Sequence, residues 1–294
     1  MKHSAKKSLI LAMLTVALLL TACSSAAPAV TQPRETAATA TPETTQATQP
    51  PQKTRTVIQS MTTDVIVGEM TISNRTDHIY DDRGLLCEIV NYSGDTEVSR
   101  TAVENDAHGE VLRQATVADN ISQVAESENT YDEMGNLVKK VDTVSVDGTA
   151  TIIREYNYNT DHKHTSCVFT TLGDPNQVTT ITYEYDSQGR EILEIQKNGD
   201  GGILQTETQY NENGQPVKFM YRNSDGEITS YSEITYEENG SEKQMTYYPD
   251  GTPSPSYTVT TRNEHGNPVT QETYNGDTLA MRITFTYITV PAFK

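Results

Sequence analysis

The sequence contains no tryptophan, only four phenylalanines and three cysteines, and 35% of its 294 residues are apolar. Three cysteines in so long a chain are too few for a fold held together by disulfides. A sandwich of two packed sheets would ordinarily bury more leucine, isoleucine, valine and phenylalanine. The composition therefore argues against both a small disulfide scaffold and a compact β-sandwich.

Positive charge is also scarce, because 22 lysines and arginines stand against 40 acidic residues, giving a formal net charge of −18. Removal of residues 1–22 would leave 19 cationic residues against 40 acidic ones, a formal charge of −21. A surface this acidic repels nucleic acids and anionic lipid headgroups. DNA and RNA are thus excluded as partners, whereas cations, basic proteins and neutral glycans stay open.

Only one long uncharged apolar run is present, from Leu9 to Leu20, and it follows a lysine-rich start. It is shorter than the roughly 20 residues that a membrane-spanning helix needs, and it is typical of an export signal. The run ends in Leu20-Thr21-Ala22-Cys23, which resembles the bacterial lipobox. That resemblance implies a signal peptide over 1–22 and a mature N-terminal Cys23 carrying palmitate-type acyl chains. An ordinary secretory signal cut nearby is the alternative.

Residues 24–56 consist almost wholly of threonine, alanine, proline, glutamine and serine, and Val30 is their only larger apolar residue. Nothing in this segment could offset the entropy lost on ordering. We therefore expect residues 23–56 to be a lipidated cysteine followed by a disordered tether, with a flexible span of about 30 Å. The tether would hold a domain over 57–294 away from the membrane, on its extracytoplasmic face.

A short pattern of the form Tyr-Asp-x-x-Gly recurs through this domain. The fifth positions of its eight copies are Gly84, Gly109, Gly135, His162, Gly189, Gly214, Gly240 and Gly266. The spacing is 25 to 27 residues throughout, which indicates a structural repeat. Roughly midway between copies lies a second turn signal, such as Asp225-Gly226 or Asn275-Gly276. Each repeat therefore holds two hairpin turns.

The segments between the turns alternate as half-buried strands do. Within 178–185, Ile181, Tyr183 and Tyr185 share one face, and residues 279–287 alternate in the same way. Eight repeats of two strands predict an all-β antiparallel meander of about 16 strands. The low apolar content favours an elongated, twisted or coiled sheet in which stability is summed along neighbouring repeats.

The repeat resembles the YD repeats of Rhs-type bacterial surface proteins over residues 70–290. The resemblance implies a long β-meander that coils into a solenoid-like sheet, which in large family members wraps a toxin. We expect eight repeats to be too few for a closed shell and expect no appended toxin domain, so encapsulation of a toxin is not implied for this chain. A 16-stranded membrane barrel with tyrosines at its strand ends is an alternative, but the lipid anchor and the Thr- and Glu-rich strand faces argue against it.

The tyrosines of the repeat are the candidate ligand-binding residues. Those that occupy the same repeat position, together with Tyr80, are Tyr131, Tyr158, Tyr185, Tyr210 and Tyr236. Stacked on successive hairpins, they form a ladder that is either a structural cross-strand contact or a platform for sugars or peptides.

Sites for other chemistry are weakly indicated. The Asp- and Asn-rich turns could bind calcium, but they lack EF-hand spacing, and turns favour these residues in any case. His162 and His164 form at most half of a metal site. No serine elbow, activated cysteine or phosphate loop is present. We therefore expect no enzyme activity, cofactor or metal.

Two cysteines stay available besides Cys23. In a meander, Cys87 and Cys167 lie six strand steps apart, or roughly 29 Å, whereas a disulfide needs Cα atoms within about 7 Å. We expect both to be reduced.

The sequence predicts a membrane-anchored extracellular lipoprotein whose repeat domain is a binding or adhesion module for a glycan or a protein. A structural envelope scaffold and an immunity-type lipoprotein, both without catalytic activity, are the alternatives.

Overall fold

The computed structural model describes residues 53–118, 121–145, 149–172 and 178–293. The expected signal peptide, Cys23 and nearly all of the expected tether lie outside these ranges. The first strand begins at Thr54, three residues before the boundary expected at residue 57. Over the described ranges, no helix is long and apolar enough to span a membrane.

Eighteen β-strands make up the described domain. They are β1 (Thr54–Val67), β2 (Met70–Tyr80), β3 (Leu86–Ser93), β4 (Thr96–Asn105), β5 (Val111–Ala118), β6 (Ile121–Tyr131), β7 (Leu137–Ser145), β8 (Thr149–Tyr158), β9 (His164–Thr171), β10 (Val178–Tyr185), β11 (Glu191–Asn198), β12 (Ile203–Tyr210), β13 (Pro216–Arg222), β14 (Ile228–Tyr236), β15 (Glu242–Tyr247), β16 (Pro253–Arg262), β17 (Pro268–Asn275) and β18 (Thr278–Pro291).

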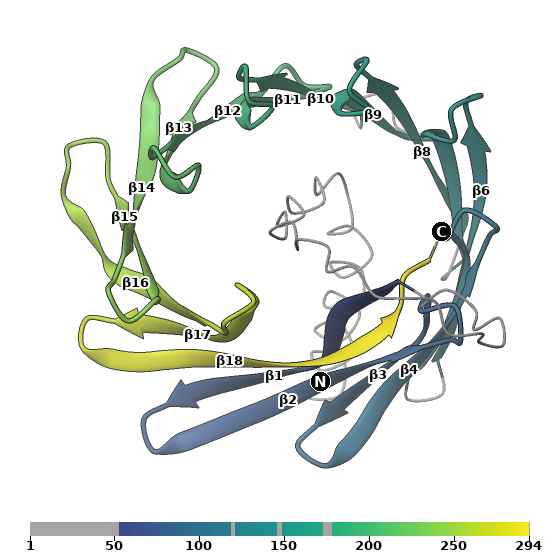
Figure 1. Ribbon diagram of the computed structural model, residues 1–294, viewed down its shortest axis with the longest axis horizontal. Helices are drawn as coiled ribbons and strands as arrows, with labels where there is room; N and C mark the ends of the chain where they lie inside the picture. The colour runs from purple at the N-terminus through teal and green to yellow at the C-terminus, as the bar shows by residue number, and fades with distance from the viewer. Residues whose placement is uncertain (1–52, 119–120, 146–148, 173–177, 294) are drawn as a thin grey trace, which may run out of the picture. The chain divides into compact units, whose positions relative to one another are not determined.

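Each strand pairs antiparallel with the next in the chain, and β18 pairs with β1, so that the sheet closes into a barrel (Figure 1). The predicted antiparallel meander is confirmed. The repeat pattern alone does not decide whether such a sheet stays open or closes. Closure removes both sheet edges, which would otherwise present unpaired backbone groups.

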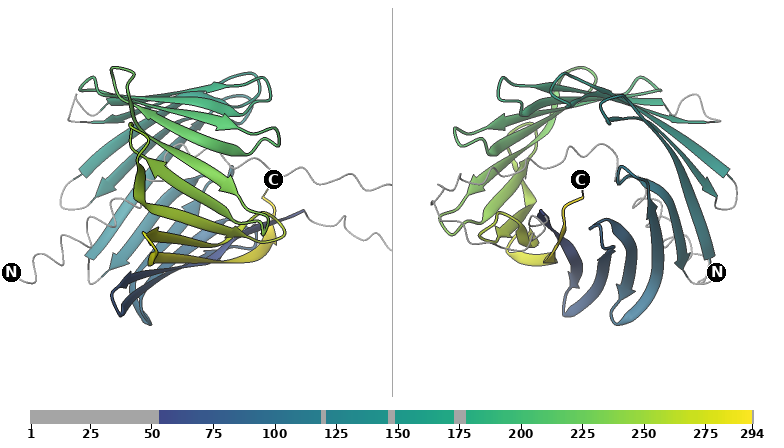
Figure 2. Two further views of the ribbon diagram at one scale, coloured as in Figure 1. Left: turned by 90° about the vertical axis from the view of Figure 1, so that its left-hand side faces the viewer. Right: turned by 45° about the vertical axis from the view of Figure 1, so that its right-hand side comes forward.

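The eight sequence repeats account for sixteen of the eighteen strands. Their Tyr-Asp turns connect β2 to β3, β4 to β5 and so on to β16 and β17, and in an up-and-down meander all eight lie at one end. We call this end the YD rim and the other end the far rim; Figure 2 shows the strands running between them. The two additional strands, β1 and β18, flank the repeats and are the longest, with 14 residues each.

The strand registers assign alternate residues to two faces of the sheet, as predicted for Ile181, Tyr183 and Tyr185. The face that carries Tyr183 contains eleven of the thirteen buried strand residues, the exceptions being Val90 and Val290. Side chains crowd on the concave side of a closed sheet, so we assign this as the inner face. The face that carries Val90 is the outer face.

The buried positions of the inner face are largely polar rather than hydrophobic. They include Ser99, Thr116, Gln123 and Ser232. Hydroxyl and amide groups bond across strands there, as between Thr101 and Thr116 at 2.8 Å. A closed sheet of 18 strands is too wide for side chains to fill its interior. Stability therefore rests on strand-to-strand contacts, in keeping with the low apolar content.

Candidate functional site

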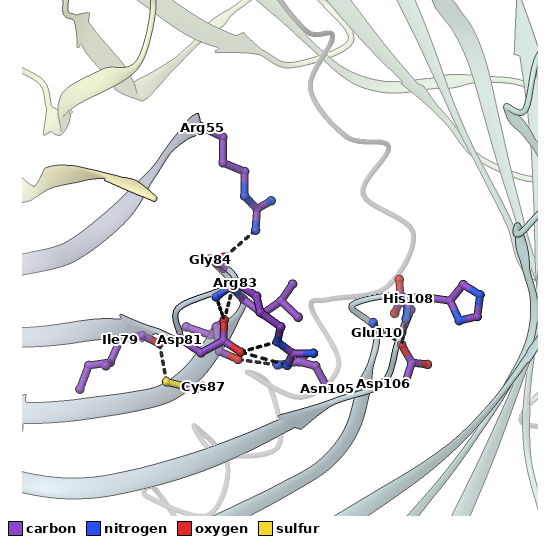
Figure 3. Close-up of polar contacts among 12 residues, drawn as sticks. Arg55, Ile79, Asp81, Arg83, Gly84, Cys87, Asn105, Asp106, His108 and Glu110 are labelled. Atoms are coloured by element: carbon purple, nitrogen blue, oxygen red, sulfur yellow. Dashed lines mark hydrogen bonds and ion pairs between the residues drawn. The ribbon is translucent and has the colours of Figure 1, made fainter. Parts of the chain in front are cut away.

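Seven of the eight turns at the YD rim share one hydrogen-bond pattern. In the first turn, the Oδ1 atom of Asp81 accepts bonds from the backbone N–H groups of Arg83 at 3.0 Å and Leu85 at 2.8 Å (Figure 3). The same two bonds recur at Asp106, Asp132, Asn159, Asp186, Asn211 and Asn263. These oxygens thus hold the turns closed. Among the described residues, no group of three or more histidine, cysteine or acidic side chains could hold a metal ion.

The turn bonds also affect acidity. The backbone N–H group of Arg190 lowers the pKa of Asp186, and the Arg190 guanidinium lowers it further. The arginine Nε atom donates to Asp186 at 2.7 Å. The turn is therefore stabilised by the ionised form of the carboxylate.

One turn keeps these bonds but departs from the sequence motif, because His162 stands where the other seven copies have glycine. Its φ of 59° lies in the left-handed region, and it is the only non-glycine residue of the described ranges with positive φ. The imidazole Nδ1 contacts Oδ1 of Asn136 at 2.9 Å. His164 instead stacks on Tyr156, with ring centroids 5.4 Å apart. The two histidines thus have separate partners.

The tyrosines predicted as ligand-binding residues all join one repeat to the preceding one. The hydroxyl of Tyr185 donates to the carbonyl oxygen of His164 at 2.8 Å. Equivalent bonds of 2.7 to 2.8 Å run from Tyr80 to Ile58, Tyr158 to Leu137, Tyr210 to Glu191, Tyr236 to Pro216 and Tyr287 to Pro268. Tyr131 donates to the Asp106 carboxylate at 2.5 Å.

The rings of these tyrosines are also partly covered. His108 stacks on Tyr131 with ring centroids 3.9 Å apart, and the Arg190 guanidinium lies 4.6 Å from the ring centre of Tyr210. These contacts indicate that the YD tyrosines have a structural role, in which they connect neighbouring hairpins of the closed sheet. Their ligand-binding role stays a prediction.

A charged cluster interrupts the polar inner face at β6–β8. Arg154 and Asp142 are both 8% exposed and form an ion pair, and Ser127 donates to Asp142 at 2.6 Å. Lys140 lies beside them, and burial lowers the pKa of its ammonium group. Its partner is Glu110, at 3.7 Å. Because each cation has an acidic partner, we interpret the cluster as structural.

Both cysteines of the repeat domain are free thiols, one in β3 and one in β9, six strands apart as predicted. Cys167 is fully buried on the inner face. Burial raises the pKa of the Cys87 thiol, and Asp81 raises it further. The Cys87 thiol therefore lacks the lowered pKa that a reactive cysteine needs.

The outer face carries ion pairs and a second set of tyrosines that the repeat motif did not single out. Tyr231 and Tyr247 stack with ring centroids 4.9 Å apart, and Tyr257 and Tyr274 with centroids 5.0 Å apart. Tyr231 and Tyr257 lie 26 residues apart, which is one repeat. This repeat spacing could have identified the second set of tyrosines from the sequence. The Tyr-Asp-x-x-Gly motif does not include them, because they lie within strands rather than at turns.

Comparisons with known proteins give structural likenesses at low identity. The chain is similar to porin-like proteins from Bacteroides uniformis ATCC 8492 (11% identity) and Bacteroides vulgatus ATCC 8482 (15% identity), each with a TM-score of 0.42 and covering 79% of this chain and 98% of the other. It also resembles part of the Photorhabdus luminescens Tc holotoxin pore, at 10% identity and a TM-score of 0.25, over 72% of this chain and 15% of that one. No family model matches the sequence, and no curated protein matches it.

Proposed function

We propose that the chain is an exported lipoprotein, anchored through acylated Cys23 on the extracytoplasmic face of the cell membrane. Its closed β-repeat domain acts as a binding module for an extracellular glycan or protein. The export signal, the lipobox-like Leu20-Thr21-Ala22-Cys23 and the Thr/Ala/Pro-rich tether support the anchored location. Acyl chains on one residue, when two or more are present, give stable membrane attachment.

The start of the described domain lies at one end of the sheet. The Lys53 carbonyl accepts a bond of 2.8 Å from the Ala292 N–H group, and Thr54 pairs with Pro291. The preceding chain therefore joins the domain at the YD rim, where β1 begins.

The outer face has the chemistry of a surface in water. Paired charges bridge its strands, as between Arg100 and Glu88, and between Arg222 and Glu207, both at 2.7 Å. Exposed apolar side chains gather elsewhere, around the far rim. Ten of the thirteen large apolar residues exposed in the described ranges lie near that rim: Val65, Val67, Met70, Ile72, Val98, Val117, Ile121, Leu172, Leu204 and Tyr248. Exposed apolar groups in such number favour a contact surface.

The observation that carries the binding proposal is the pair of stacked tyrosine groups on the outer face. Unlike the YD tyrosines, Tyr231, Tyr247 and Tyr257 make no interstrand hydroxyl-to-carbonyl bond among the described contacts. Tyr231, Tyr247, Tyr257 and Tyr274 are half-buried on this face. Tyrosine combines apolar area with a hydrogen-bonding group at low entropic cost, and it is enriched in binding surfaces.

Two experiments test the proposal. Fractionation of cells that express the full chain should place it in the membrane, and Cys23→Ser should release it and remove the acyl mass. The full-length protein in a sugar-free detergent should bind members of an array of glycans and extracellular proteins. A membrane fraction unchanged by Cys23→Ser would refute the anchor. Absence of any binding on the array would favour the envelope-scaffold alternative.

A further inference from the structure

We infer that the outer face of β13–β17 is a binding site for a neutral oligosaccharide of about four sugar units. The inference rests on the proposed binding function and names its site and ligand class. It follows from two copies of one side-chain arrangement in successive repeats. Each copy contains a lysine, a methionine and a stacked pair of tyrosines.

The first copy lies on β13–β15. The Lys218 Nζ atom lies 4.1 Å from the ring centre of Tyr231, and Tyr247 stacks on the same ring at 4.9 Å. Met220 is the direct cross-strand partner of Tyr231. The lysine, the methionine and the tyrosine pair therefore form one continuous surface on the outer face.

The second copy repeats this arrangement on β15–β17. The Lys243 Nζ atom also lies 4.1 Å from the ring centre of Tyr257, on which Tyr274 stacks at 5.0 Å. Met245 is the cross-strand partner of Tyr257. The hydroxyl of Tyr274 donates to Glu272 at 2.8 Å, which restricts the orientation of the Tyr274 ring. The stacking distances of the two copies agree closely, so a ligand meets the same chemistry twice.

The copies differ in charge. In the first, Lys218 is neutralised by Glu233 at 3.0 Å. In the second, Val259 is the cross-strand partner of Lys243, at the position that Glu233 has opposite Lys218. Lys243 has no carboxylate within ion-pair distance among the described residues. Its ammonium group is thus available to donate hydrogen bonds to a ligand.

The dimensions favour an oligosaccharide over a globular protein. Equivalent groups of the copies are two strand spacings apart, or about 9.6 Å, and the five strands span about 19 Å. Three residues along a strand rise about 10 Å, so the patch covers roughly 200 Å². This is well below the roughly 800 Å² per partner of a standard protein interface. A repeating polymer presents the same group at regular intervals, and sugars offer hydroxyl groups and apolar C–H faces together.

The charge of the protein selects a neutral sugar. With a formal charge of −18, or −21 without residues 1–22, the protein repels polyanions over the distance of the screening length. A single unpaired ammonium group, that of Lys243, does not reverse this repulsion. A neutral oligosaccharide is not repelled, and it can accept a hydrogen bond from Lys243 through a hydroxyl or an acetamido oxygen.

The test uses full-length protein in a sugar-free detergent. The probes are tetramers and dimers of β-1,4-linked glucose, β-1,4-linked N-acetylglucosamine and α-1,4-linked glucose. Binding is followed by tyrosine fluorescence, which no tryptophan obscures. One of the tetramers should bind at least tenfold more tightly than its dimer, because only the tetramer reaches both copies.

Matched variants locate the site. Tyr257→Ala should weaken binding of that tetramer about tenfold or more, and Lys243→Gln, which keeps all the rings, about threefold or more. The control is Tyr92→Ala, since Tyr92 also lies under a cation, Arg75 at 4.1 Å, but belongs to neither copy. Its affinity should equal that of the parent protein. Circular dichroism and a urea midpoint show whether each variant is folded.

Several results would overturn the inference. Equal affinity for dimer and tetramer, or equal losses in Tyr257→Ala and Tyr92→Ala, would show that the paired copies are not the site. Sugar binding that survives Lys243→Gln and Tyr257→Ala but is lost in Tyr185→Ala would move the site to the YD tyrosines and leave the proposed function intact. A chain that binds a purified extracellular protein but no sugar would refute the ligand class alone. If it binds neither, both proposals fail.

Discussion

The hydroxyl of Tyr185 lies 2.8 Å from the carbonyl oxygen of His164, and this contact joins one YD hairpin to the preceding one. Because the same bond recurs around the wall, the YD tyrosines are connectors between repeats. Each repeat buries little apolar surface, so these polar connections have a large share in the cohesion of the domain.

Removal of one connector should weaken the fold measurably. We expect Tyr185→Phe to lower the free energy of unfolding by about 1 kcal/mol, the usual net contribution of one hydrogen bond, with a further cost if the His164 carbonyl is left without a partner. Urea unfolding measures the change. The control is Tyr248→Phe, because Tyr248 is 52% exposed and lies at a far-rim turn. Equal stability of both variants and the parent would contradict a connecting role.

Gly84, in the turn between β2 and β3, should tolerate substitution less well than a turn glycine with open space around it. Gly84 has a φ of +81°, and a Cβ atom there would overlap the carbonyl oxygen of Pro291. Gly226 has a similar φ of +78° but open space around it. We expect Gly226→Ala to cost about 1–2 kcal/mol from backbone strain and Gly84→Ala clearly more. Thermal unfolding of the two variants tests this order, which a reversed result would contradict.

The stability of the domain should decrease in acid through its turn carboxylates. The pKa of Asp186 is lower in the folded state than in the unfolded chain. Its contribution is therefore fully present above the unfolded pKa, near 3.9, and is lost as the pH falls through the folded value. Asp186→Asn keeps the acceptor oxygen that Asn159, Asn211 and Asn263 supply in other turns.

We accordingly expect Asp186→Asn to fold normally and to show a smaller loss of stability than the parent between about pH 5 and pH 2. Urea unfolding at a series of pH values measures the slope. Identical slopes in the variant and the parent would mean that this turn does not contribute to acid sensitivity.

The ion pair on the inner face should be costly to break from one side. Arg154 and Asp142 are each 8% exposed, so removal of one partner leaves a charge with little access to water. We expect Asp142→Asn to cost about 3 to 5 kcal/mol, and Arg154→Met with Asp142→Leu together to cost much less. Guanidinium unfolding of the single and double variants decides the matter. A double variant as unstable as the single one would contradict this account.

The local features of the sequence predicted a large part of the fold. The Asp-x-x-Gly turns, the alternation around Tyr183 and the two hairpins per repeat are confirmed. They were predictable because a turn depends on a positive φ and a short-range bond, and alternation depends only on the pleat. The repeat count predicted about 16 strands rather than the 18 observed, because β1 and β18 lie outside the repeats.

The candidate site was less accessible to sequence reasoning. The repeat motif drew attention to Tyr185 and its equivalents, whose hydroxyls bond within the wall. Tyr231 and Tyr257 carry no turn motif, and only the registers bring them against Tyr247 and Tyr274. Which tyrosines connect the wall and which lie on its outer face depends on the partner that each meets on the next strand.

The sequence by itself determined the period, the strand direction and the two rims, because each of these arises from contacts within one or two repeats. Only the tertiary structure decided that the sheet closes. The pairing of Thr54 with Pro291 joins the two ends of the described domain. It depends on the twist and curvature accumulated over all the strands between them, and no single repeat contains that sum.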